Sequence, residues 1–175
     1  AQAAPMTFTA TPPKQDRYDR LRAQAFGDGV WLQVAMLERG LARVAISPDR
    51  NECAPDLYEA EARGRNARAG LWAVSTYAPR PAQAMKGTAG SFQVVEGWVT
   101  NVVTASGRTS IDFGGDGGGE RVFSAVIQPQ DRAAFRGHDL RDLIARHVRI
   151  RGMVVDVRGR PEIGLSNPAQ IEFLD

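Results

Sequence analysis

The chain has 175 residues, enough for one ordinary domain or two small ones. Hydrophobic residues make up 43% of it, a normal share for a globular protein, and no apolar run approaches the length that spans a membrane. The formal net charge is only +2, despite an isoelectric point near 9.0, so no strong global field draws the protein to nucleic acid.

Two short strands are predicted near the N-terminus. Residues 5–10 alternate weakly between apolar and polar, and residues 11–15, with two prolines, predict a turn. Residues 21–26 alternate as a half-buried strand does. Residues 27–29, Gly-Asp-Gly, then predict a tight turn.

Two helices are predicted next. Apolar residues recur at helical spacing over 30–39, and Gly40 stands where a left-handed C-terminal residue belongs. A second amphipathic helix is predicted over 55–69 and ends at Gly70. We expect Trp72 to anchor this helix to the strands.

The stretch from Asp16 to Trp72 resembles a known family. It contains, in order, the blocks DRYDR, DG, GLARV, AEARGRNAR and GLW. These blocks resemble the C-terminal half of a staphylococcal-type, thermonuclease-like nuclease domain. Asp19 departs from the family pattern, where Gly is usual, and Arg22 stands where Leu is common.

The resemblance implies that part of the family domain is absent. In the family, strands that carry the metal-binding carboxylates, a second arginine and a glutamate precede this stretch. Only fifteen residues precede Asp16 here, so we expect those strands to be missing from the chain or supplied by a partner segment.

Residues 91–175 have a different sequence pattern from the first half of the chain. They predict the element order β-β-β-α-β-β, which is that of an OB-fold barrel, with a glycine-rich hairpin tip and a helical region broken at Gly137. Gly97 and Gly152 are predicted to mark strand bends. Asp-Phe-Gly at 112–114 and Gln-Ile-Glu at 170–172 resemble the OB-like tails that follow thermonuclease-like domains.

The predicted fold is therefore mixed β/α, in three parts. Residues 1–75 form an incomplete thermonuclease-like segment, an OB-related barrel plus helices that lacks its first strands. Residues 76–90, rich in proline and glycine, are predicted to be a linker. Residues 91–175 form a five-stranded OB-fold-like β-barrel.

Arg20 is the first candidate site residue. The resemblance implies that Arg20 is the active-site arginine and that Tyr18 lies beside the bound phosphate, with Asp16 as a structural partner in the turn. A guanidinium there donates two hydrogen bonds to the charge that builds up on phosphate oxygens in the transition state. The alternative is structural: Arg20 pairs with Asp16 or Asp19, and Tyr18 is a half-buried turn residue.

No metal site is assignable from the sequence, although the family is calcium-dependent. His138 and His147 lie nine residues apart, which matches neither a helical pair nor a zinc motif, and Cys53 is the only cysteine. Asp112 and Asp116 flank the glycine-rich tip and would make a poor calcium loop.

A second candidate site lies in the predicted barrel. Alternation on the fourth strand leaves Arg149 and Arg151 facing away from the core, and Arg158 and Arg160 lie on the following loop. Four arginines there would make a phosphate track for single-stranded nucleic acid. The alternative is a solvated face or a protein-docking surface, because few aromatic residues are available for base stacking.

The sequence thus predicts a nuclease-family protein whose intact parent hydrolyses phosphodiesters, with calcium as cofactor, and a chain that is inactive alone. The alternative is a non-catalytic module that uses its barrel to bind single-stranded DNA or RNA, or protein. No membrane association is expected. The family resemblance and the alanine-rich N-terminus favour an exported protein.

Overall fold

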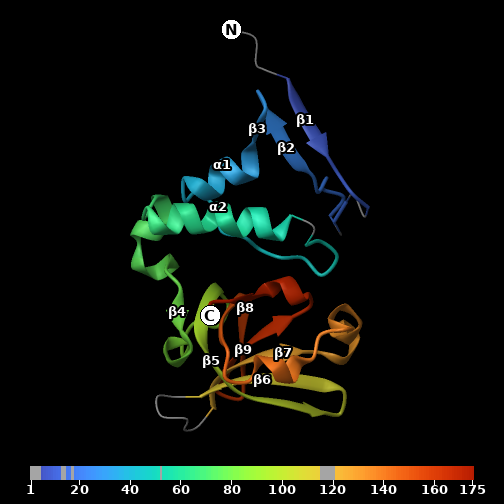
Figure 1. Cartoon of the computed structure of the whole chain (residues 1–175), viewed down its shortest axis with the longest axis vertical. Helices are drawn as coiled ribbons and strands as arrows, with labels where there is room; N and C mark the ends of the chain where they lie inside the picture. The colour runs from blue at the N-terminus through green and yellow to red at the C-terminus, as the bar shows by residue number, and fades with distance from the viewer. Residues whose placement is uncertain (1–4, 13–14, 17, 52, 115–120) are drawn as a thin grey trace. The chain divides into compact units, whose positions relative to one another are not determined.

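A computed structural model describes residues 5–12, 15–16, 18–51, 53–114 and 121–175 (Figure 1). Its contacts divide the chain into two compact units, residues 1–44 with 52–76 (unit 1) and residues 45–51 with 77–175 (unit 2). The predicted glycine-rich tip lies almost wholly at 115–120, outside the described residues, as do the first four residues of the N-terminus. No helix in the described ranges is long and apolar enough to cross a membrane.

Unit 1 begins with a three-stranded antiparallel sheet in the order β1 (Met6–Thr9), β2 (Gln24–Gly27) and β3 (Val30–Trp31). The predicted turn between β2 and β3 is present. Its central residues, Asp28 and Gly29, have φ of 50° and 74°, the left-handed values that suit a two-residue hairpin. All four residues of β1 are exposed, so this strand buries neither of its faces.

Two helices follow, α1 (Leu32–Glu38) and α2 (Ala54–Asn66), and glycines allow them to approach closely. A Cβ on Gly64 of α2 would lie 2.3 Å from the carbonyl oxygen of Leu37. Gly40 has φ of 64°, as predicted for the residue that ends α1, and a Cβ there would lie 2.0 Å from the carbonyl oxygen of Ala69. The helices therefore end and pack where glycine leaves room for backbone.

The segment after α2 is short and helical. It consists of the 3₁₀ turns η1 (Gly70–Ala73) and η2 (Ser75–Tyr77), and Trp72 within η1 is buried. The buried carboxylate of Glu61, on α2, accepts a 2.7 Å hydrogen bond from the Val44 backbone N–H, which fixes the chain that follows α1.

Unit 2 contains the predicted five-stranded barrel. Neighbouring strands around it are β5 (Phe92–Ala105), β6 (Arg108–Gly114), β7 (Arg121–Ile127), β9 (Arg160–Leu165) and β8 (His147–Val157). The β8 strand pairs back onto β5, which closes the barrel, and β7 and β9 are parallel whereas the other pairs are antiparallel. The predicted mixed β/α fold with an OB-fold-like barrel is confirmed.

The barrel core comes from the inward face of each strand. Phe113 on β6 and Phe123 on β7 are almost fully buried, with ring centroids 5.2 Å apart. The two strand glycines make room for this core. A Cβ on Gly97 would lie 2.9 Å from the Phe113 ring, and one on Gly152 would lie 2.6 Å from Ile163 Cγ2.

The segment predicted as a linker is part of this core. Within residues 76–90, β4 (Arg80–Pro81) pairs in parallel with β5, and η3 (Ala82–Ala84) follows it. Ala82 and Met85 are 1% and 0% exposed and belong to the hydrophobic cluster of the barrel. Prolines and glycines indicated a flexible connection, but two apolar side chains of the segment, Ala82 and Met85, are buried in the barrel while most of its other residues are exposed.

Two other details differ from the prediction. The helical region between β7 and β8 is made of 3₁₀ turns, η4 (Pro129–Phe135) and η5 (Leu140–Leu143), on either side of Gly137. The chain also continues beyond the predicted order of five strands. It forms η6 (Pro168–Gln170) and a separate strand β10 (Ile171–Phe173), which pairs with the outer edge of β8.

Candidate functional site

The corner that contains Arg20 is built around the carboxylate of Asp16. Oδ1 of Asp16 accepts hydrogen bonds from the backbone N–H groups of Tyr18 at 2.8 Å and Arg20 at 3.0 Å. The backbone N–H of Asp16 also donates to the Arg20 carbonyl, and the Asp16 carbonyl accepts from the Asp19 N–H, so the side chain and backbone of Asp16 together hold the described residues of this turn. Asp19 has φ of 59°, a left-handed conformation that glycine adopts freely and aspartate tolerates.

Arg20 donates from this corner to the other oxygen of Asp16. Its Nε and Nη2 lie 2.7 Å and 2.6 Å from Asp16 Oδ2. The Arg20 side chain nonetheless remains 72% exposed, and its guanidinium lies 5.1 Å from the centre of the Tyr18 ring. The guanidinium is thus oriented by one acid and one aromatic ring while it faces solvent.

The same hydrogen bonds perturb Asp16. The Arg20 side chain, followed by the backbone N–H groups of Arg20 and Tyr18, lowers the pKa of Asp16 to about 2. Asp16 is therefore ionised at neutral pH and forms an ion pair with Arg20. These contacts are those of the structural alternative: Asp16 organises the turn and Arg20 pairs with it. The Arg20 side chain nevertheless remains accessible to solvent.

The described residues do not fit the calcium ion that the family implies. Each oxygen of Asp16 already accepts two hydrogen bonds, so this carboxylate has its acceptor sites committed to the turn and to Arg20. Within the described ranges, no three His, Cys, Asp or Glu side chains lie close enough together to hold a metal ion.

The arginines of β8 do not form the predicted phosphate track. Arg149 donates through Nε and Nη2 to Glu96 at 2.9 Å and 2.7 Å, and its Nη1 lies 3.4 Å from Glu172. The Arg151 side chain is 0% exposed and donates through Nη2 to the other oxygen of Glu172. Both side chains do point away from the core, but acids on β5 and β10 pair with them, so they form structural ion pairs, of which the Arg151 side chain is fully buried.

Arg158 and Arg160 are placed differently. They flank the tip of the β8–β9 hairpin, both are exposed, and within the described residues neither makes an ion pair. They line a cavity of about 590 Å³ that also contains Arg108 and Arg121, at the starts of β6 and β7. Sequence analysis missed these two arginines, since only the pairing of β6, β7 and β9 brings them to the cavity.

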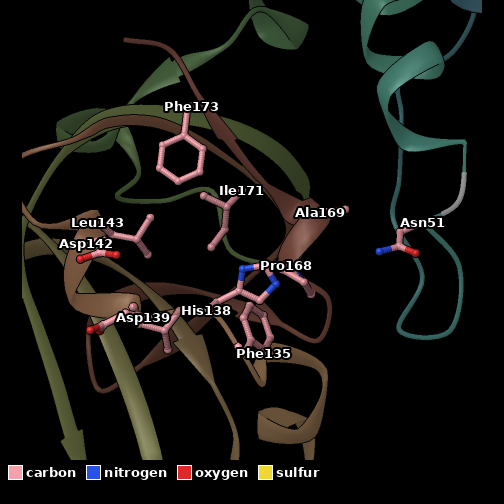
Figure 2. Close-up of a pocket in the computed structure, with 12 residues that line it drawn as sticks. Asn51, Phe135, His138, Asp139, Asp142, Leu143, Pro168, Ala169, Ile171 and Phe173 are labelled. Atoms are coloured by element: carbon pink, nitrogen blue, oxygen red, sulfur yellow. The ribbon is translucent and has the colours of Figure 1, made fainter.

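A second hollow of about 540 Å³ lies beside η4, η5 and β10 (Figure 2). Its walls combine apolar side chains, among them Phe135, Leu143, Ile171 and Phe173, with polar ones, among them His138. Asp139 is part of the same wall, and its carboxylate accepts a hydrogen bond from the Arg141 N–H at the start of η5. This carboxylate therefore has a structural role as a cap.

Comparisons with known proteins gave one family match and a likeness to a solved structure. Residues 4–74 match the family model described as "Staphylococcal nuclease homologue". Among solved structures, the chain is similar to one titled "OBody AM3L09 bound to hen egg-white lysozyme", with 21% identity, a TM-score of 0.38, and coverage of 55% of this chain and 93% of that one. No curated protein matched the chain.

Proposed function

We propose, from the premise that residues 4–74 are a staphylococcal nuclease homologue segment, that this segment acts on the phosphodiester backbone of nucleic acid through Arg20. The observation that carries the proposal is the geometry of the Asp16–Arg20 corner. There, a guanidinium is held by an ionised carboxylate and yet stays 72% exposed. This exposure leaves the oriented guanidinium accessible to a phosphate that approaches from solvent.

The corner suits the chemistry of phosphate. Both contacts to Asp16 are made by Nε and Nη2 with a single oxygen, so Asp16 does not engage Nη1. A phosphate that approaches from solvent meets a cation whose direction is already fixed, and a fixed donor stabilises developing charge better than a mobile one. Tyr18, whose ring lies against the guanidinium, is placed to contact the same phosphate.

Cleavage requires more than this corner. Hydrolysis of a phosphodiester needs an activated water and further stabilisation of charge, and one guanidinium supplies neither a base nor a site for a cation. We propose that the acidic residues for these steps lie outside the described part of the chain, in a preceding segment or a partner chain. The 175-residue chain alone is then expected to bind phosphodiesters and to cleave them little or not at all.

A cleavage and binding assay tests the proposal. Fluorescent single-stranded DNA is incubated with the 175-residue chain and calcium, and cleavage and affinity are measured for the wild type, Arg20→Ala and Arg39→Ala. Arg39 is an exposed arginine at the end of α1, so its substitution matches the change in charge. The proposal requires that Arg20→Ala weakens binding and Arg39→Ala does not. Rapid cleavage that persists in Arg20→Ala would contradict it.

A second candidate function belongs to the barrel: binding of single-stranded nucleic acid at the β8–β9 hairpin. The exposed cations Arg158 and Arg160 on this hairpin favour it, because OB-folds bind oligonucleotides beside this loop. Arg149 and Arg151 are no longer part of this candidate, since their charges are matched by Glu96 and Glu172.

A further inference from the structure

We propose that the cavity on the outer face of β6, β7 and β9 binds a phosphate group, and that Arg108 and Arg121 are its principal ligands. The lining consists of four arginines, one glutamate, one glutamine and one valine, namely Arg108, Arg121, Gln128, Val157, Arg158, Arg160 and Glu162. Positive charge therefore exceeds negative charge in the lining, although the chain as a whole is almost neutral.

Beneath these arginines lies a row of polar side chains that face away from the barrel core. Asp112, Ser124 and Glu162 are direct neighbours across β6, β7 and β9. Although they lie on the outside of the sheet, they are only 8%, 2% and 7% exposed. The acids in this row give the arginines fixed partners, so the cations are positioned before any ligand arrives.

Arg108 reaches across β7 to one end of this row. Its Nη2 donates to both oxygens of Glu162, at 2.8 Å and 2.7 Å, while the Arg108 side chain remains 36% exposed. A full fork between arginine and carboxylate uses two nitrogens, but Glu162 engages only one. Glu162 thus anchors Arg108 through Nη2 and leaves the other guanidinium nitrogens of Arg108 able to donate to a ligand.

Arg121 is held more loosely at the other end of the row. Its Nη1 lies 3.5 Å from Oδ1 of Asp112, the outer limit for a hydrogen bond. That oxygen already accepts hydrogen bonds from the hydroxyls of Ser110 and Ser124. These hydroxyls already satisfy Asp112 at shorter distances. Arg121 therefore loses only a weak contact with Asp112 when it donates to an incoming anion.

The remaining two arginines are presented by a well-defined turn. Arg158 and Gly159 have φ of 56° and 80°, and the Gly159 N–H donates to the Asp156 carboxylate at 2.7 Å. This hairpin tip directs exposed Arg158 and Arg160 to the rim of the same cavity. The cavity therefore has two arginines anchored by the acids of the polar row, Arg108 and Arg121, and two further arginines at its rim.

The chemistry of the lining selects a phosphate. Guanidinium groups match the oxygens of a phosphate in charge and in planar geometry. Among the described residues that line the cavity, none is aromatic, so the site offers contacts to a phosphate but no platform for base stacking. The phosphate belongs either to the backbone of a nucleic acid, in which case the inference rests on the second candidate function, or to a small phosphorylated molecule.

Binding measurements on the full chain test the inference and distinguish these sources. The probes are fluorescent oligothymidylate, for affinity and its salt dependence, and inorganic phosphate, as ligand and as competitor. The variants are Arg121→Gln and Arg108→Gln, with Arg141→Gln as a matched control in the same unit, on η5 and outside the cavity. Circular dichroism and thermal unfolding identify any variant that fails to fold.

We expect Arg121→Gln to weaken oligothymidylate binding about tenfold and to lower the salt dependence by about one phosphate contact. Arg141→Gln is expected to bind like the wild type, and phosphate is expected to compete. A second outcome is that the wild type binds phosphate but not oligothymidylate, and that Arg121→Gln abolishes phosphate binding. This result would support the phosphate site and contradict the second candidate function. If oligothymidylate binds equally well to the wild type and to folded Arg121→Gln, the inference is overturned while nucleic-acid binding stands.

Discussion

The two sheets of this protein differ in closure. In unit 2, β8 pairs back onto β5, so each strand of the barrel has two neighbours, and the inward side chains are almost completely buried. In unit 1, β1 and β3 are the edges of a three-stranded sheet, and Met6 and Phe8 on β1 are 50% and 55% exposed. The same kind of alternating strand therefore makes a core in one unit and an open surface in the other.

This difference teaches that alternation alone does not bury a side chain. Burial follows from the number of partners a strand finds, and an open sheet leaves apolar residues and backbone groups exposed at its edges. The arginines of the two units also differ in exposure. In the closed barrel, acids on neighbouring strands cover Arg149 and Arg151, whereas Arg20 sits on a corner of unit 1 and stays exposed.

The largest expected contrast lies between two phenylalanines on strands. Phe113→Ala removes a fully buried ring from the barrel core and should cost about 4 kcal/mol of the free energy of unfolding of unit 2. Phe8→Ala removes a ring that is mostly in water and should change the stability of unit 1 by less than about 0.5 kcal/mol. Hydrogen exchange resolved by residue measures both units. Equal costs would break the contrast between the closed and the open sheet.

A second contrast separates structural from accessible arginines. Arg151→Ala removes a fully buried arginine, leaves the mostly covered carboxylate of Glu172 without its closest cation, and should destabilise the barrel by about 3 kcal/mol. Arg160→Ala removes an exposed charge and should stay within about 0.5 kcal/mol. Urea unfolding, followed by a barrel-specific signal, compares the two. A stable Arg151→Ala variant that loses nucleic-acid binding would restore the phosphate track on β8.

A third comparison concerns two glycines of unit 1 that both have a positive φ. Gly40→Ala combines a left-handed backbone with a Cβ placed 2.0 Å from the Ala69 carbonyl oxygen, and should destabilise unit 1 by about 2 kcal/mol or more. Gly29→Ala has the same backbone strain but nothing within 4 Å of the new Cβ, so it should cost about 1 kcal/mol. Residue-resolved hydrogen exchange would report the difference, and its absence would mean that the helices do not pack as closely as described.

The smallest expected effect concerns the titration of Asp16. Its pKa is lowered to about 2 chiefly by the hydrogen bond from Arg20, so Arg20→Ala should raise the pKa of Asp16 toward 3.8. Because the folded pKa lies below the unfolded value, the pair contributes fully above pH about 4 and its contribution is lost as the pH falls through about 2. Carboxyl carbon NMR titration measures this. An unchanged pKa would mean that the backbone N–H groups, not Arg20, set it.

Much of the fold was predictable because it depends on local signals. The strands from β5 to β9 follow from alternation and from the glycines between them, and Gly40 marks the end of α1, whereas α2 ends at Asn66, before the Gly70 that was predicted to end it. The 76–90 segment was not predictable, because burial of Met85 depends on a barrel formed by later residues.

The candidate sites show the same limit. Arg20 was predicted as a site residue from the family resemblance, and its pairing with Asp16 was foreseeable because both lie in the same turn. The covering of Arg149 by Glu96 and the meeting of Arg108 with Glu162 join residues that are more than fifty positions apart. No spacing rule predicts such contacts, since they depend on which strands become neighbours.

The most direct test of this account is an NMR titration that follows the Nε–Hε signals of the arginines as a short single-stranded DNA is added. The account predicts that Arg20, Arg108 and Arg121 shift, while Arg149 and Arg151 keep their positions because Glu96 and Glu172 already bind them. The contrary result, with Arg149 and Arg151 shifting and Arg20 unmoved, would show that the structural and the phosphate-facing arginines have been assigned the wrong way round.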